Sequence, residues 1–145
     1  GWFGAYGEGW AHYCETLGPE FGLYTDPYQK MGYLSDQMLR AVRLVVDTGL
    51  HTGTMNREEA IKYFLSNISY DEAAATAEVE RYMALPGQAL GYKIGALRIR
   101  ELRDKYQKEL GAKFSLAKFH DEILNQGCLP LDVLDRKMEN WAKRQ

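Results

Sequence analysis

Apolar residues recur along most of the chain at intervals of three and four positions, which is the spacing of one helical face. The clearest case starts at Asp26-Pro27, where a capping residue and a proline predict the beginning of a helix. That helix is expected to end near Gly49 and carries Met31, Leu34, Met38, Ala41, Leu44 and Val45. No segment alternates apolar and polar residues, so no sheet is expected. The pattern predicts an all-α fold.

Glycine, proline and capping residues divide the pattern into about seven helices. Gly18-Pro19 is expected to end the first, Thr54 or Asn56 to cap the third, and Ser69 to Glu72 to form a capping box for the fourth. The expected ranges are about 7–17, 27–49, 57–65, 70–85, 88–110, 116–126 and 130–143. We expect a multi-helix array that forms one domain over residues 1–145.

Composition narrows the classes of function. The 145 residues are 46% hydrophobic, which allows a single core, and the formal charge of −2 gives no reason to expect nucleic acid as a partner. No apolar run approaches the roughly 20 residues of a transmembrane helix. Cys14 and Cys128 are too few for a disulfide framework; two buried thiols are expected, and one bridge between them is the alternative. The chain begins with Gly1 instead of Met, so we expect its true beginning to have been removed.

The most informative segment lies near the start of the chain. Glu8, His12 and Glu15 follow i, i+4, i+7 spacing and share one helical face, and Gly7 and Gly9 flank the first of them. Glycine at these positions allows a backbone or a ligand to approach closely. Spacing alone leaves two interpretations open. Either the residues are ordinary helix-terminal and hydrogen-bonded groups, or Glu8 and His12 supply half of a zinc site.

The motif Glu8-Gly9-Trp10-Ala11-x-Tyr13-x-Glu15 resembles the second zinc motif of the gluzincin peptidases. The resemblance implies that Glu8 is the third zinc ligand and that Glu15 steadies a histidine ligand upstream. The usual H-E-x-x-H pair of histidines, and the general base within it, are absent from this sequence. A catalytic zinc needs about three protein ligands and an open position for water, so the chain alone is expected to bind zinc poorly and to be inactive.

Further segments resemble a bacterial family known as domain of unknown function 885. They are Arg43-x-Val45-Val46-Asp47-Thr48-Gly49-Leu50-His51, Arg81-Tyr82-x-x-x-Pro86-Gly87-Gln88-Ala89-x-x-Tyr92-x-x-Gly95, Phe119-His120-Asp121 and Leu129-Pro130-Leu131. The resemblance covers nearly the whole chain. It implies a helical zinc peptidase of which this chain is the carboxyl-terminal portion, with a peptide as substrate and the missing amino-terminal part as a further partner.

Several residues are candidates for the reaction. Tyr92 and His51 are expected to stabilise the oxyanion, with Asp47 orienting His51. Each has a structural alternative: Gly91 and Gly95 predict a close helix crossing beside Tyr92, and Asp47 could form a surface pair with Arg43. Substrate contacts are expected from Arg43, Arg81, Tyr82 and Gln88.

The preferred hypothesis is therefore the carboxyl-terminal part of a zinc-dependent metallopeptidase that hydrolyses peptide bonds with zinc-activated water. A non-catalytic helical binding domain is the alternative, and an independent metal site using Glu8, His12 and Glu15 is a third possibility. His120 is expected to be structural. The bacterial cell envelope is favoured slightly over the cytoplasm as the compartment.

Overall fold

A computed structural model describes residues 2–145, and every regular element in this range is helical. The elements are α1 Gly4–Glu15, α2 Leu17–Glu20, α3 Pro27–Thr52, α4 Arg57–Asn67, α5 Glu72–Ala84, α6 Leu90–Leu110, the short 3₁₀ helix η1 Gly111–Lys113, α7 Leu116–Leu124 and α8 Leu131–Ala142. Apart from the single-turn α2 and η1, the seven longer helices correspond to the seven that the sequence predicts. The all-α prediction is confirmed.

Several helix ends follow the predicted capping chemistry. Asp26 caps α3, Ser115 caps α7, and Asn56 forms a full capping box with Glu59 at α4. The predicted box at Ser69 is wrong, because Asp71 caps α5 by accepting a hydrogen bond from the Ala74 amide.

Two other predicted helix ends are wrong. α3 continues past Gly49 to Thr52 and ends at Gly53, whose φ of 73° is the left-handed conformation that glycine adopts without strain. The first helix stops at Glu15, and Gly18-Pro19 lies inside α2, since proline is tolerated in the first turn of a helix.

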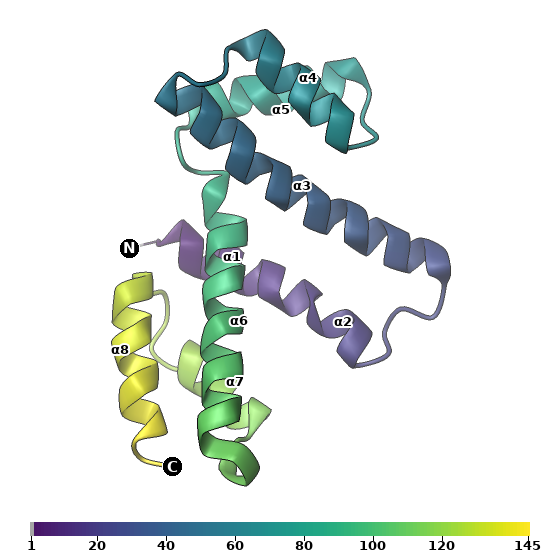
Figure 1. Ribbon diagram of the computed structural model, residues 1–145. Helices are drawn as coiled ribbons and strands as arrows, with labels where there is room; N and C mark the ends of the chain where they lie inside the picture. Colours follow the sequence, from purple (N-terminus) through teal and green to yellow (C-terminus); the bar gives the residue numbers. More distant parts are fainter. Residues whose placement is uncertain (1) are drawn as a thin grey trace.

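The core is divided into two clusters. One joins α1, α7 and α8 to most of α6, with Tyr13, Ile99, Phe119 and Met138 fully buried. The other lies among α3, α4 and α5, and Ala89 joins it from the position just before α6. Figure 1 shows α6 as the long central helix between these two parts of the molecule. The first turns of α6 therefore connect the two clusters.

α1 and α6 cross with their backbones in close contact (Figure 1). A β-carbon added to Gly95 would lie 1.7 Å from the carbonyl oxygen of Ala5, and one added to Gly9 would lie 2.5 Å from Gly95 Cα. Only glycine fits at these two positions. The close crossing predicted from Gly91 and Gly95 is confirmed, and it fixes the rotation of α1 against α6.

Candidate functional site

The α1 face that the sequence singles out points toward α3. His12 is buried, and its Nδ1 lies 2.9 Å from Glu15 Oε2 and 3.4 Å from Gln37 Nε2. The second carboxylate oxygen of Glu15 lies 4.0 Å from Arg40. Glu8, one turn before His12, is half-buried and forms no hydrogen bond or ion pair within residues 2–145. The face thus combines one fixed carboxylate with one that remains available.

A row of polar side chains along α3 continues from this face. We call it the polar seam: Gln37, Arg40, Arg43, Asp47 and His51 of α3, with the polar groups of α1, α5 and α6 that they contact. Lys93 of α6 donates to Gln37 Oε1 at 3.0 Å. The guanidinium groups of Arg40 and Arg43 lie 5.7 and 5.2 Å from the centre of the Tyr92 ring, within cation–π range. Tyr92 therefore connects α6 to α3 through its ring, and its hydroxyl forms no hydrogen bond within the described chain.

The middle of the seam is a buried ionic cluster between α3 and α5. Arg43 donates to Glu78 at 3.0 Å and to the Tyr82 hydroxyl at 3.1 Å, and that hydroxyl also donates to Glu78. Arg81 donates to Glu78 at 3.2 Å and to Gln88 at 2.8 Å. Arg43 and Tyr82 are 8% and 1% exposed, whereas Arg81 and Gln88 reach the surface. Of the four predicted substrate contacts, two are accessible and two are enclosed.

The far end of the seam is an aspartate–histidine pair. Asp47 is buried, and its Oδ1 accepts from His51 Nδ1 at 2.9 Å and from the Gly87 amide at 3.1 Å. The suggested surface pair of Arg43 with Asp47 is wrong, because both residues are buried and bind different partners. His51 itself is exposed, and with Nδ1 occupied by Asp47 its Nε2 is the nitrogen left for a ligand.

Burial and hydrogen bonding shift the protonation of the seam residues. Burial alone would raise the pKa of Glu78, but hydrogen bonds from Tyr82, Arg81 and Arg43 lower it to about 2. Burial lowers the pKa of His12 and outweighs the hydrogen bond to Glu15. The backbone and side-chain hydrogen bonds to Asp47 raise the pKa of His51. At neutral pH the cluster is ionised, and His12 is neutral.

The hydrogen bond to Glu15 sets the tautomer of the His12 ring, because a carboxylate only accepts. Its Nδ1 carries the proton that Glu15 accepts, so Nε2 has a lone pair, and this nitrogen is sealed from solvent without a partner within the described chain. Residues 2–145 contain no group of three His, Cys, Asp or Glu side chains that could hold a metal ion. Glu8 and His12 together are fewer than the three protein ligands of a catalytic zinc. The α1 face fits a contribution to a metal site and not a complete one.

The other histidine and the cysteines have structural surroundings. His120 Nε2 lies 2.9 Å from the Tyr13 hydroxyl, and its ring packs among those of Trp10, Tyr13 and Phe119. Cys14 and Cys128 are both free thiols, as predicted, but each is half-buried and not buried.

Three seam residues were not predicted: Gln37, Glu78 and Lys93. The signal for Gln37 was available, because a polar residue here extends the row of Arg40, Arg43, Asp47 and His51 by one turn. For Glu78 and Lys93 the sequence offers no such signal, since they lie on other helices.

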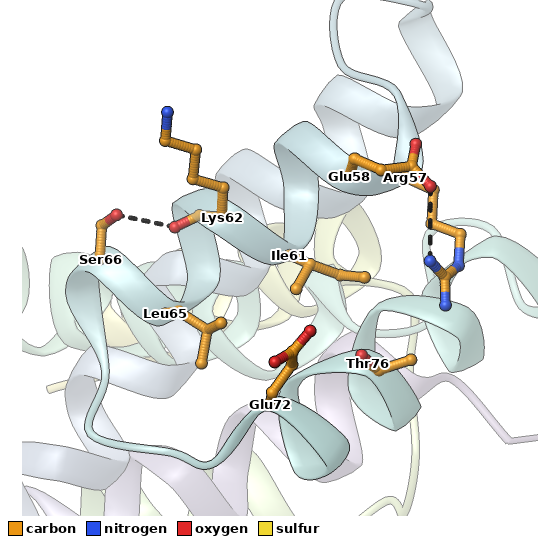
Figure 2. A pocket seen from close by; sticks show the side chains of 8 residues that line it. All are labelled: Arg57, Glu58, Ile61, Lys62, Leu65, Ser66, Glu72 and Thr76. Atoms are coloured by element: carbon orange, nitrogen blue, oxygen red, sulfur yellow. Dashed lines mark hydrogen bonds and ion pairs between the residues drawn. The ribbon is translucent and has the colours of Figure 1, made fainter.

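A surface hollow with a volume of about 560 Å³ lies away from the seam, between α4 and α5. Figure 2 shows its lining, in which charged side chains surround the apolar Ile61 and Leu65. No residue of the polar seam takes part. This hollow is therefore separate from the candidate site.

Comparisons with known proteins agree with the fold. Residues 1–138 match the family described as "Bacterial protein of unknown function (DUF885)". A search of curated proteins gave no significant match. A crystal structure described as "the putative lipoprotein from Colwellia psychrerythraea" matches with a TM-score of 0.96 and 48% identity over 99% of this chain. This chain spans 25% of the length of that protein. Within residues 2–145, no helix has the length and apolar character needed to cross a membrane. The chain belongs to the bacterial DUF885 family.

Proposed function

We propose that the chain is the carboxyl-terminal portion of a zinc-dependent peptidase and forms one wall of its active-site cleft. The observation that carries the proposal is Glu8: the residue is half-buried, and its carboxylate has no partner within residues 2–145, on the same helical face as the His12–Glu15 pair. A carboxylate that the chain itself does not occupy is available as an oxygen ligand for a metal. The resemblance of Glu8 to Glu15 to the second zinc motif of gluzincins supports the same role.

Glu8 supplies one zinc ligand, and the remaining ligands come from other parts of the longer protein. Zinc in such a site lowers the pKa of bound water and makes it a nucleophile near neutral pH. The second role on this face belongs to Glu15, which already accepts a hydrogen bond from one imidazole and retains a partly exposed oxygen. Glu15 is a positioning residue that steadies a histidine ligand.

The polar seam supplies the remaining chemistry. His51 presents Nε2 to a substrate carbonyl while Asp47 holds Nδ1. Tyr92 is held in place through the two guanidiniums on its ring, which leaves its hydroxyl able to donate to an oxyanion. Arg81 and Gln88 contact the peptide at the accessible edge, and Arg43 and Tyr82 support them through Glu78.

The compartment that we propose is the cell envelope. Its support is the description of the Colwellia protein as a "putative lipoprotein".

The test uses a hybrid protein in which this chain replaces the homologous quarter of the Colwellia protein. Zinc content after dialysis is measured for the hybrid, for Glu8→Gln and for Glu109→Gln, an exposed control on α6. We expect Glu8→Gln to lose zinc and peptidase activity together and Glu109→Gln to retain both. Glu15→Gln should weaken zinc binding by about 10- to 100-fold. Full zinc occupancy in Glu8→Gln would refute the proposal and favour a non-catalytic binding domain.

A further inference from the structure

We propose that an exposed apolar stripe on α3 is the surface on which the rest of the longer DUF885 polypeptide packs. The stripe consists of Met31, Leu34, Met38 and Val45. This inference goes beyond the proposed function and does not depend on it, because it requires neither zinc nor catalysis.

The four side chains form a continuous helical face. Their exposed fractions are 66%, 48%, 47% and 40%, in the order of the sequence. Since an α-helix turns once in about 3.6 residues, spacings of 3, 4 and 7 place them in one row. A single exposed apolar residue is ordinary, but a row of four along one helix marks an interaction surface.

The stripe is not the face through which α3 packs against the other helices of the described chain. Leu39, Val42 and Val46 form a second apolar face, which is buried among α4 and α5. The polar seam occupies a third face. The stripe adjoins this buried face, because Met31 and Val42 are about three helical turns apart in the sequence. A helix with so broad an apolar surface is normally covered by protein over all of it. In Figure 1 α3 extends away from α6 and α5 at its amino-terminal end, where most of the stripe lies. One side of α3 therefore lacks its partner within the described chain.

The length of the Colwellia protein indicates which partner packs on the stripe. Its homologous quarter has the same fold at 48% identity, so about three quarters of that polypeptide lies outside the matched region. Segments of one polypeptide are held at high effective concentration, so a modest apolar row is sufficient for packing. A stable homodimer needs about 20 residues from each side, many more than the stripe offers. Both considerations favour the rest of the same chain over a second copy.

Two residues of the stripe, Met31 and Met38, can be oxidised and therefore report on how exposed the stripe is. Oxidation of each methionine by dilute peroxide is followed by mass spectrometry in this 145-residue chain and in the hybrid protein. Met138, which is fully buried, serves as the slow reference in both. We expect Met31 and Met38 to oxidise at least about tenfold more slowly in the hybrid, since buried thioethers are shielded from the oxidant.

A second measurement uses substitution. Leu34→Lys should lower the melting temperature of the hybrid and leave that of the 145-residue chain nearly unchanged, because the site is exposed in the shorter chain. Gln107→Lys, at an exposed position of α6 away from the stripe, is the matched control and should change neither. Equal oxidation of Met31 and Met38 in both proteins would overturn the inference. So would a dimer of the 145-residue chain, seen by sedimentation, in which the two methionines are already protected.

Discussion

Two contacts with α6 organise this molecule, and they are opposite in chemistry. α1 meets α6 through glycine, with backbone against backbone and no space for a side chain. α3 meets the same helix through long polar side chains, with Lys93 on Gln37 and two arginines on Tyr92. The first contact fixes the position of Glu8 by steric exclusion. The second depends on charge and hydrogen bonding, so it responds to pH, salt and ligands. A candidate metal ligand is thus placed on the rigid side, and candidate substrate contacts are placed on the adjustable side.

Placing a methyl group in the glycine crossing should have the largest effect on stability. Gly95→Ala brings a β-carbon against the Ala5 carbonyl, so the two helices must separate, and we expect a loss of about 4 kcal/mol in the free energy of unfolding. Gly32→Ala is the control, because it lies in α3 with open space around it. That substitution should stabilise by about 0.5–1 kcal/mol through helix propensity. Urea titration measures both, and similar values for the two variants would show that the crossing is not tight.

Removing one partner from the ionic cluster should have the next largest effect. Arg43→Met leaves Glu78 and the Tyr82 hydroxyl partly buried without their shared partner, which should cost about 3 kcal/mol. The double variant Arg43→Met/Glu78→Leu removes both charges and should recover much of that loss. A double-mutant cycle from chemical denaturation gives the comparison. A double variant as unstable as the sum of its single variants would argue against coupling across the seam.

Acid should weaken the polar seam and leave the glycine crossing unaffected. The pKa of Glu78 is about 2 in the folded protein, below its ordinary value, so its stabilisation is complete above pH 5 and is lost as the pH falls toward 2. We expect a loss of about 2 kcal/mol from this residue between pH 6 and pH 3. The measurement is unfolding at a series of pH values for the wild type and Glu78→Gln. An unchanged acid dependence in Glu78→Gln would contradict this assignment.

Tyr92→Phe should have the smallest effect on stability. The ring and its two cation–π contacts remain, and the hydroxyl has no internal hydrogen bond to lose, so the melting temperature should hardly change. If the hydroxyl donates to an oxyanion, kcat of the hybrid on a peptide substrate should fall by about 100- to 1000-fold. A kcat within a few-fold of the wild type would transfer that role to His51 or to another part of the longer protein.

Local chemistry explains which features the sequence could predict. Asp26, Asn56 and Ser115 act on amides two or three residues away, so the helices that they cap were predictable. The Ser69 capping box was wrong because Asp71 supplies a competing carboxylate closer to the helix.

Contacts between helices that are distant in the sequence were harder to predict. Gly91 and Gly95 predicted that something approaches closely, and only the fold shows that it is α1. The sequence did not predict Glu78 and Lys93 as part of the candidate site, because spacing along one helix does not identify the residues on its neighbours. The polar row on α3 could be read as a face but not assigned its partners. Sequence thus predicted helices and part of their faces, and tertiary packing decided which faces meet.

Because α6 lies between the two core clusters, its length determines how one part of the molecule is rotated relative to the other. Ala89, just before α6, belongs to one cluster, and the buried residues of α6 from Ala96 onward belong to the other. Because a helix advances about 1.5 Å and turns about 100° per residue, inserting one residue here would rotate α3, α4 and α5 by that angle relative to α1. The carboxylate of Glu15 and the guanidinium of Arg40 would then no longer face one another. Substitutions at exposed positions of this segment keep its length and therefore the relative rotation of the two parts. Insertions and deletions change both, so the fold should tolerate them least.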